Sequence, residues 1–431
     1  MKMAKLKKRK VNQIMAKNIL LAALRDNEAS KGKKGDDFFD ANASTISYST
    51  GFPVLDYYLG YKVNVYDENG EYLYSYPSVG ITAGSYVLFI GKPSTSKTAT
   101  AIKIASNIVR KFANGLVIHF DLEQALNYSR IQALTRIPMN ELESKYVLRQ
   151  EDCTLENMKS TIMRLYNEKV NNPNDYMYNT GLKNEFGEEI QAFVPTVIIL
   201  DSIATITMSI EGGGEKKLEK LEEISTQTDR MRLTGEIGRF FNEILPYLRK
   251  ANITLIAINQ IKTNPQMGIV KSPAEILGLG TSETLPGGNT PKFLAHILLK
   301  FVAVGGEKYN EEDEGFTGFK VRVEIIKSRV SAALKNVELI YNSNVGIDMV
   351  RSTVAYAKDM GLIGGNKNGY YFLSDKDEKF TLANMPEDFK NNPKLFKIMK
   401  DNVIPLLEKN LSGIKPEEME IAEEELNFYD L

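Results

Sequence analysis

The stretch YVLFIGKPSTSKTATAIKIASNIV, residues 86–109, joins an apolar run to an amphipathic helical pattern through the loop GKPSTSKT. The loop follows the phosphate-binding pattern of Gly, four residues and Gly-Lys-Ser/Thr, except that Ser96 replaces the second glycine. A strand, loop and helix in this order direct backbone N–H groups and a helix N-terminus at an anion. Ser96 keeps its N–H and is small, but it costs free energy if its φ is positive. We therefore predict a nucleotide site, with a chance spacing as the alternative.

The residue types in this loop predict separate roles. Lys97 would reach the β- and γ-phosphates of a nucleotide, and Thr98 would ligate Mg²⁺. The residues expected to contact the nucleotide are Gly91, Lys92, Pro93, Ser94, Thr95, Ser96, Lys97, Thr98, Ala99 and, from a later strand, Asp201.

Three further apolar runs end in polar side chains. LVIHFDLEQAL carries Glu123, which is placed to deprotonate an attacking water. TVIILD ends in Asp201, which has the form of a carboxylate that holds Mg²⁺ through water, although such a residue also caps helices. ITLIAINQI ends with an amide pair that includes Gln260, positioned to sense a γ-phosphate, although such a pair is also common in loops. Ligands of α/β sheets bind at such strand ends, so these side chains support the nucleotide site.

Short apolar runs alternate with helical patterns along the chain. Several runs are apolar at successive rather than alternate positions, as a strand covered on both faces requires. The pattern predicts an α/β fold with a mostly parallel central sheet flanked by helices. The predicted strands are 86–91, 116–121, 196–201, 253–259, 296–304 and 321–327, and the covering helices lie within 102–113 and 236–251.

The ends of the chain differ from its centre. Residues 1–45 combine a basic amphipathic helix with a linker, and residues 346–431 predict a small C-terminal domain of short helices with an acidic tail. Both tails could equally be solvated surface. The core between them, 46–345, contains two hairpin-like insertions near 62–77 and 176–193, of which the second could equally be a surface excursion.

The composition limits the class of protein. Lys plus Arg (54) nearly balances Asp plus Glu (55) over 431 residues, so no global basic excess indicates nucleic-acid binding. One cysteine excludes an intramolecular disulfide, and two histidines give no metal cluster. No apolar run approaches the ~20 residues of a membrane span. We expect a cytoplasmic protein without a membrane partner.

Together these motifs resemble the RecA family of recombinases, especially the UvsX-type enzymes of tailed phages, over about 49–365. The segment before the family's phosphate loop is similar to STGFPVLDYYLG. The family's turn with the catalytic glutamate is similar to FDLEQALN, and its Mg²⁺-binding strand is similar to VIILDSIA. LIAINQI is similar to the strand whose glutamine couples ATP to DNA binding. The resemblance implies a RecA-type P-loop ATPase core that uses ATP and Mg²⁺, with Glu123 and Gln260 in these two roles. Phage relatives also carry a non-glycine residue before the lysine, which makes Ser96 a lineage variant.

The resemblance also implies where DNA and a neighbouring subunit bind. IIKSRVSAALKNVELIY is similar to the strand whose two basic residues, here Lys327 and Arg329, reach the neighbour's ATP. PGGNTPKFLAHILLKF is similar to the stretch that ends the second of two DNA loops, which would be about 208–232 and 262–287. A solvated loop, or a short salt-bridged helix at EKKLEKLEEI, is the alternative. The residues expected to bind DNA are Lys216, Lys217, Arg230, Arg232, Lys262, Lys271, Gly287, Gly288 and Asn289.

The predicted function is that of a recombinase that coats single-stranded DNA and exchanges it into a homologous duplex. The basic N-terminal helix would dock on the next protomer and build a helical homo-oligomeric filament. Single-strand-binding and mediator proteins are further expected partners, in a host-cell cytoplasm if the source is viral. One alternative is a hexameric helicase or translocase, against which the basic pair at 327 and 329 argues. The other is a RecA-like accessory DNA-binding protein without turnover.

Two variants test these expectations. Glu123→Gln should abolish turnover and preserve ATP-stabilised DNA binding. Removal of the acidic residues after Lys415 should ease DNA binding at low Mg²⁺.

Overall fold

The computed structural model describes residues 46–411, apart from 68, 186, 213–214, 221–226, 264–282, 311–314 and 367–368. The predicted N-terminal helix and linker and the predicted acidic tail lie outside the described residues, as does most of the second predicted DNA loop. No helix within the described ranges is long and apolar enough to cross a membrane.

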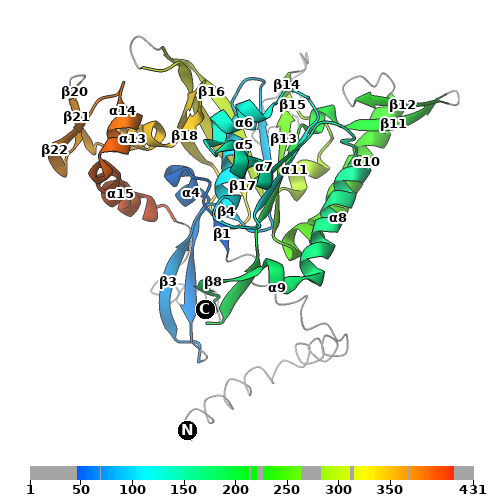
Figure 1. Cartoon of the computed structure of the whole chain (residues 1–431), viewed down its shortest axis with the longest axis horizontal. Helices are drawn as coiled ribbons and strands as arrows, with labels where there is room; N and C mark the ends of the chain where they lie inside the picture. Colours follow the sequence, from blue (N-terminus) through cyan, green and yellow to red (C-terminus); the bar gives the residue numbers. More distant parts are fainter. Residues whose placement is uncertain are drawn as a thin grey trace, which may run out of the picture.

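A nine-stranded sheet in the order β19-β18-β17-β16-β5-β13-β10-β6-β7 forms the centre of the molecule (Figure 1). The pairs from β16 to β7 are parallel, and the pairs from β16 to β19 are antiparallel. This confirms the predicted mostly parallel α/β sheet. The strands are β5 (Tyr86–Gly91), β6 (Leu116–Asp121), β7 (Tyr146–Arg149), β10 (Thr196–Asp201), β13 (Ile253–Gln260), β16 (Ile297–Tyr309), β17 (Gly318–Ser328), β18 (Lys335–Asn342) and β19 (Gly346–Asp348).

Two hydrophobic layers cover the two faces of this sheet. Along β5, Val87 and Phe89 point into the layer shared with α5 (Lys97–Val109), whereas Tyr86 and Leu88 point into the opposite layer. The opposite layer is covered by α8 (Leu155–Asn171) and α10 (Gln227–Lys250), which lie along one side of the molecule in Figure 1. Burial on both faces explains why the strands are apolar at successive positions.

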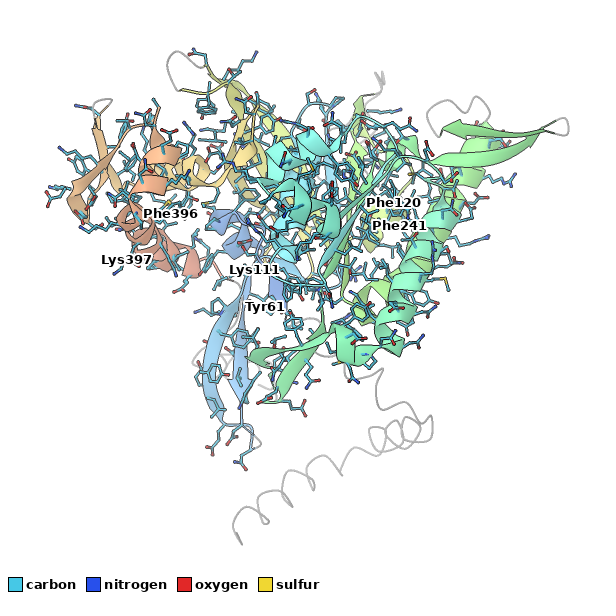
Figure 2. All side chains as sticks on the ribbon, in the orientation of Figure 1. Tyr61, Lys111, Phe120, Phe241, Phe396 and Lys397 are labelled. Carbon is cyan, nitrogen blue, oxygen red and sulfur yellow. The ribbon has the colours of Figure 1, made fainter. Side chains whose placement is uncertain are left out.

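Aromatic side chains fill the layer under α10. Phe241 of α10 stacks on Tyr86 of β5 with ring centroids 4.8 Å apart, and Phe120 of β6 belongs to the same cluster. Figure 2 labels Phe120 and Phe241, which both belong to the cluster on the α10 side of the sheet. This layer fixes the start of β5, and with it the position of the phosphate loop at the other end of the strand.

Both predicted insertions are hairpins. One pairs β2 (Tyr61–Tyr66) with β3 (Tyr72–Ser78), and the other pairs β8 (Met177–Lys183) with β9 (Glu189–Phe193). The two hairpins contact each other, because the hydroxyl of Tyr76 donates to the carbonyl of Lys183 over 2.9 Å.

A third hairpin replaces part of the first predicted DNA loop. β11 (Thr207–Gly212) pairs with β12 (Glu215–Lys220), and α10 already begins at Gln227. The alternative of a salt-bridged helix at EKKLEKLEEI is therefore wrong for 215–220, because this segment is paired as a strand with β11. The described part of 208–232, predicted as a loop, therefore consists mainly of the β11–β12 hairpin and the start of α10.

The C-terminal part contains a small sheet in addition to the predicted helices. Strands β20 (Ile363–Asn366), β21 (Gly369–Phe372) and β22 (Asp375–Phe380) pair antiparallel beside α13 (Met349–Asp359), α14 (Met385–Asn391) and α15 (Pro393–Glu408). The short helices expected after 346 are present, whereas the sheet was not predicted. Buried side chains of these elements join the same hydrophobic cluster as α5, so the apolar core is continuous across the predicted boundary at 345, and a separate domain stays a prediction.

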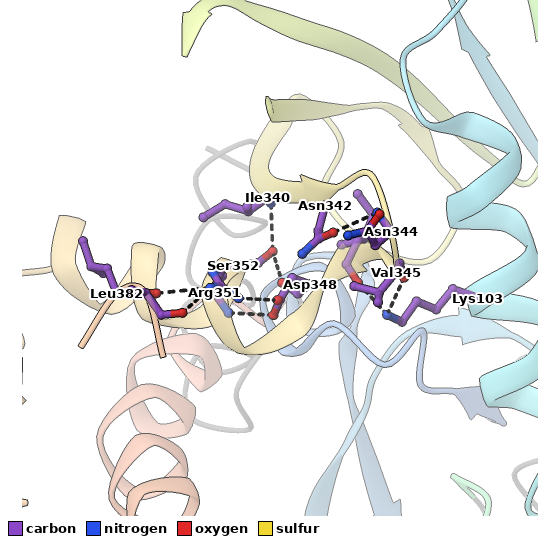
Figure 3. A network of polar contacts seen from close by, with 11 residues as sticks. Lys103, Ile340, Asn342, Asn344, Val345, Asp348, Arg351, Ser352 and Leu382 are labelled. Atoms are coloured by element: carbon purple, nitrogen blue, oxygen red, sulfur yellow. Dashed lines mark hydrogen bonds and ion pairs between the residues drawn. The ribbon is translucent and has the colours of Figure 1, made fainter. Parts of the chain in front are cut away.

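A polar network links this part to α5 (Figure 3). The ammonium of Lys103 in α5 donates to the carbonyl of Ile347 in β19 over 2.6 Å. Asp348 caps α13 by accepting from the amide of Arg351, whose guanidinium donates to the carbonyls of Leu382 and Ala383 over 3.2 Å each. These contacts hold the end of the sheet against the helix that begins at the phosphate loop.

The remaining elements connect these layers. They are β1 (Ser47–Tyr48), α4 (Pro53–Leu59), β4 (Ile81–Thr82), α6 (Tyr128–Thr135), α7 (Met139–Lys145), α9 (Pro173–Tyr176), the 3-10 helix η1 (Ile203–Thr205), β14 (Lys262–Thr263), β15 (Glu283–Thr284) and α11 (Thr290–Leu294).

Candidate nucleotide site

The predicted phosphate loop lies between β5 and α5 at the carboxyl edge of the parallel strands. Ser96 has φ 66° and ψ 11°, the left-handed conformation that a glycine adopts without cost. Ser94 also has a positive φ of 60°. The conformational cost foreseen for a serine at position 96 is therefore present. Left-handed residues in a loop before a helix are typical of loops whose successive N–H groups face an anion.

Lys97 is buried at the start of α5. Its ammonium donates to the carbonyls of Gly91 and Lys92 over 3.1 and 2.7 Å, and to the hydroxyl of Thr95 over 3.3 Å. Burial lowers the pKa of Lys97 to about 8, while the charges of Asp201 and Glu123 oppose this shift. Lys97 therefore folds back over its own loop, where carbonyl and hydroxyl oxygens of the loop hold its ammonium.

Asp201 at the end of β10 faces Thr98 in the first turn of α5. The hydroxyl of Thr98 donates to Oδ2 of Asp201 over 2.6 Å. Burial raises the pKa of Asp201 to about 7, against the Thr98 hydrogen bond, and Glu123 and Asp121 add to the rise. A hydroxyl and a carboxylate at hydrogen-bond distance fit the oxygen ligands that Mg²⁺ prefers.

The other ligands of such an ion would come from outside the protein. In the described part of the chain, no group of three or more His, Cys, Asp or Glu side chains could hold a metal ion. This pattern suits Mg²⁺, which usually keeps waters and binds substrate phosphates in addition to one or two protein oxygens.

Glu123 and Gln260 meet across the carboxyl edge of the sheet. Nε2 of Gln260, at the end of β13, donates to Oε1 of Glu123 over 2.8 Å. The hydroxyl of Ser202 donates to the same oxygen over 3.2 Å. The side chains predicted to activate water and to sense the γ-phosphate are therefore in direct contact.

The turn that carries Glu123 is held by a residue that the sequence did not single out. Nε2 of Gln150, just after β7, lies 2.9 Å from both Oδ2 of Asp121 and the carbonyl oxygen of Leu126. Oδ2 of Asp121 also accepts from the amide of Leu126 over 3.0 Å. The only signal for Gln150 in the sequence is a polar residue after a four-residue strand, which is too short to be recognised by pattern.

A cavity of about 570 Å³ collects these groups. Its lining comprises Pro93, Ser94, Thr95, Ser96, Lys97, Thr98, Ala99, Glu123, Leu126, Arg130, Leu134, Asp201, Ile258, Gln260, Phe319 and Tyr341. Gly91 and Lys92 are not in this lining, and their carbonyls instead accept from Lys97.

Aromatic and basic side chains missed by sequence reasoning line one part of the cavity. The rings of Phe319 on β17 and Tyr341 on β18 have centroids 4.9 Å apart. The guanidinium of Arg130 on α6 donates to the hydroxyl of Tyr341 over 3.2 Å and to the carbonyl of Asn344 over 3.1 Å. No local pattern marks these residues, because the fold brings α6 against the paired strands β17 and β18, and Arg130 is 211 positions from Tyr341.

Lys327 and Arg329 lie away from this cavity. Lys327 pairs with Leu298 at the start of β16, so both basic residues are at the sheet edge opposite the phosphate loop. The ammonium of Lys327 and Nη2 of Arg329 donate to the carbonyl of Phe293 over 2.6 and 3.3 Å. Burial, with a contribution from Arg329, lowers the pKa of Lys327. Neither residue can act on a nucleotide in its own protomer's cavity.

The residues predicted to bind DNA lie in several places. Lys216 and Lys217 are in β12, and Arg230 and Arg232 are in the first turns of α10, where Arg232 pairs with Glu236 over 3.4 Å. Lys271 lies outside the described residues.

The remaining predicted DNA-binding residues follow β13. Lys262 is in β14, which pairs with β15. Gly287 and Gly288 have φ of 80° and 78°, and a Cβ at Gly287 would lie 2.8 Å from Ile203 of η1. This turn, with Asn289 after it, is tied to β13, because Nδ2 of Asn259 donates to the carbonyl of Pro286 over 2.9 Å.

Residues 189–348 match the family model of the RecA N-terminal domain. Protein RecA of Campylobacter jejuni subsp. jejuni is 29% identical over 224 residues, which are 49% of this chain and 57% of that protein. Protein RecA of Legionella pneumophila is 26% identical over 339 residues, which are 77% of this chain and 80% of that protein. Protein RecA of Mycoplasma mobile is 24% identical over 223 residues, 51% of this chain and 59% of that protein.

The extent of these matches differs between relatives. The chain spans just over half the length of the Campylobacter and Mycoplasma proteins and most of the length of the Legionella protein. The region matched by the family model contains Asp201, Gln260, Lys327 and Arg329, and the phosphate loop precedes it.

Proposed function

We propose that this RecA-family protein is an ATP-dependent DNA recombinase that forms a filament on single-stranded DNA and exchanges it into a homologous duplex. The observation that carries the proposal is a pair of neighbouring contacts on β13. Gln260 reaches Glu123 in the nucleotide cavity over 2.8 Å, and Asn259 reaches Pro286, at the start of the predicted DNA-binding turn, over 2.9 Å. One strand end thus touches both sites, which is what coupling of ATP to DNA binding requires.

Within the nucleotide cavity, each residue has a proposed role. Glu123 accepts a proton from the attacking water, and Gln260 releases Glu123 when it turns toward the nucleotide. Lys97 and the N–H groups of the loop bind the phosphates, and Thr98 and Asp201 hold Mg²⁺, the latter through water. When bound, Mg²⁺ neutralises charge on the transferred phosphate. Phe319, Tyr341 and Arg130 offer flat surfaces for the nucleobase.

The basic residues at the other sheet edge act between protomers. We propose that Lys327 and Arg329 stabilise charge on the γ-phosphate of the neighbouring protomer's ATP, as an arginine finger does. Their distance from their own cavity supports this reading. A contact between opposite edges of successive chains is head-to-tail, and such contacts build helical filaments when the rotation does not close.

The proposed DNA site combines β11–β12, the start of α10 and the turn 286–289. Backbone N–H groups and basic side chains there would contact phosphates, so binding would be largely indifferent to base sequence.

Single-strand-binding and mediator proteins are proposed further partners, and the cytoplasm is the proposed location. Placement among the UvsX-type recombinases of phages rests on the motif resemblance and is also a proposal.

The test is ATP hydrolysis with and without single-stranded DNA, with electron microscopy of the same samples and Lys97→Ala as the inactive control. We expect DNA-stimulated hydrolysis and open helical filaments, followed by strand exchange between homologous DNA molecules. Closed rings with stimulated hydrolysis would instead identify a helicase or translocase. DNA binding without hydrolysis would identify an accessory protein.

A further inference from the structure

Part of the nucleotide cavity is lined by α6, β17 and β18, which carry neither the phosphate loop nor the proposed base. Arg130 and Leu134 come from α6, Phe319 from β17 and Tyr341 from β18. Phe319 and Tyr341 are half-buried, and their ring centroids lie 4.9 Å apart. Arg130 is the one charged residue among these four, so the contacts of its guanidinium decide how this part of the cavity is held together.

The guanidinium of Arg130 bridges two acceptors at the end of β18. Nη2 donates to the hydroxyl of Tyr341 over 3.2 Å, and Nη1 donates to the carbonyl of Asn344 over 3.1 Å. A planar guanidinium fixes the directions of both N–H groups at once. The bridge therefore sets the position of the Tyr341 ring relative to α6, which a flexible ammonium with a single nitrogen could not do in the same way.

The turn between β18 and β19 is also held by contacts that do not involve this bridge. Gly346, at the start of β19, has φ 76°, and a Cβ there would lie 2.9 Å from Cδ2 of Leu134, which lines the cavity. On the other side, the ammonium of Lys103 donates to the carbonyl of Ile347 over 2.6 Å. Loss of the bridge should consequently release the tyrosine ring and leave the wall of the cavity in place.

We propose that Arg130 is a positioning residue for the nucleobase, because it holds the Tyr341 ring in the orientation in which the ring stacks on the base. A ring whose rotamer is fixed before binding loses less conformational freedom when the ligand arrives. The phosphates are bound by a different segment, the loop 91–98, so Arg130 should affect the contribution of the nucleobase alone. Arg130 thereby makes the site select nucleotides over inorganic polyphosphates. This inference rests on the proposed function as far as nucleotide binding is concerned.

Two ligands with the same number of phosphates separate the two parts of the cavity. The imido analogue of ATP carries a nucleobase and resists hydrolysis, whereas inorganic tripolyphosphate has no base. Each is titrated with Mg²⁺ into the full chain by calorimetry. We expect the unaltered chain to bind the analogue about tenfold or more tightly than tripolyphosphate. Arg130→Ala should weaken the analogue about tenfold and tripolyphosphate less than about twofold, so that tripolyphosphate also reports that the variant is folded.

Three further variants test whether Arg130 acts through Tyr341. Tyr341→Phe keeps the ring and removes the acceptor of the bridge, so its combination with Arg130→Ala should bind the analogue no more weakly than Arg130→Ala alone. Arg130→Lys keeps the charge without the planar fork and should lose about as much as Arg130→Ala. Arg164→Ala, at an exposed position of α8, is the matched control and should bind both ligands like the unaltered chain.

Several results would overturn the inference. Equal weakening of both ligands in Arg130→Ala would mean that the residue supports the whole cavity. Full affinity of Arg130→Lys for the analogue would mean that charge matters rather than position, and additive losses in the combined variant would mean that Arg130 does not act through Tyr341.

The proposed function can fail separately from this inference. Equal affinity of the unaltered chain for the two ligands would overturn the role of Arg130, while DNA-stimulated ATP hydrolysis would leave the proposed function standing. Absence of hydrolysis, together with a loss confined to the analogue in Arg130→Ala, would refute the proposed function and leave the role of Arg130 standing.

Discussion

Ser96 shows, at a single position, what a departure from the usual phosphate-loop pattern costs. Its φ of 66° places a β-carbon in the left-handed region, which is unfavourable by roughly 1–2 kcal/mol for residues other than glycine. Its hydroxyl is also buried without a partner among the described residues. The surrounding fold over-determines this conformation, because β5 and α5 fix both ends of the loop.

Ser96→Gly should therefore stabilise the nucleotide-free protein. Relief of the left-handed strain exceeds the entropy that glycine adds to the unfolded chain, for a net gain of about 0.5 kcal/mol in the free energy of unfolding. Ser160→Gly in the exposed interior of α8 is the matched control and should lower stability by about 0.5 kcal/mol. Denaturant unfolding measures both changes. A loss of stability in both variants would show that Ser96 is not strained.

Asp201 makes stability depend on pH. Its folded-state pKa of about 7 lies above its usual 3.8, so the folded chain binds more protons than the unfolded chain between these values. Stability contributed by the protonated carboxyl is present at low pH and is lost as the pH rises through about 7. Asp201→Asn removes this titration and keeps an acceptor for Thr98.

Without nucleotide or Mg²⁺, Asp201→Asn should therefore raise the melting temperature above that of the unaltered chain. This increase should be several degrees larger at pH 8 than at pH 5. The corresponding difference in the free energy of unfolding is on the order of 2–4 kcal/mol. Asp377→Asn on exposed β22 serves as the control. Equal effects of Asp201→Asn at both pH values would contradict the raised pKa.

At the scale of elements, the short strand β7 positions the turn that carries Glu123, the proposed base. Gln150 follows this strand and ties Asp121 to Leu126, so it holds this turn from outside the lining of the cavity. Gln150→Ala should lower kcat about tenfold or more and change KM little, because misplacement of a catalytic group affects the transition state more than binding. Gln191→Ala on β9 is the control. A change confined to KM would assign Gln150 to nucleotide binding instead.

The strands and their ends were largely predictable from the sequence, for a physical reason. Burial on both faces requires continuous apolar runs, and the runs at β5, β6 and β10 have the predicted bounds. The strand β7 has four residues and β20–β22 alternate weakly, so no run marks them. The helix α8 did carry a signal, because Thr154 caps it and Leu155, Met158 and Ile162 repeat at helical spacing.

The site was predictable where its residues follow strands and unpredictable where they converge from afar. Glu123, Asp201 and Gln260 each end an apolar run, and all three line the cavity. Arg130 and Tyr341 are 211 positions apart and meet only because β18 is added to the antiparallel end of the sheet. No local pattern encodes such a contact.

At the scale of the whole molecule, the proposed filament implies that a complete catalytic site would need two chains. Glu123→Gln alone and Lys327→Ala/Arg329→Ala alone should each lose nearly all hydrolysis, since one lacks the base and the other lacks the neighbour's charge. Mixed in equal amounts, they should recover up to about a quarter of the unaltered activity, because random head-to-tail contacts sometimes unite both intact halves. Glu143→Gln mixed with unaltered chain is the control. No recovery on mixing would mean that Lys327 and Arg329 do not act in trans.

The phosphate loop and the Lys327–Arg329 pair lie on opposite edges of one sheet, so the molecule has a front and a back. A row of such chains begins with a nucleotide pocket that no neighbour completes and finishes with a basic pair that faces solvent. The two ends of the proposed filament would be chemically different, and only one of them would carry a nucleotide that cannot be hydrolysed. Protomers should accordingly add and dissociate at unequal rates at the two ends, which would give the proposed filament a direction along DNA.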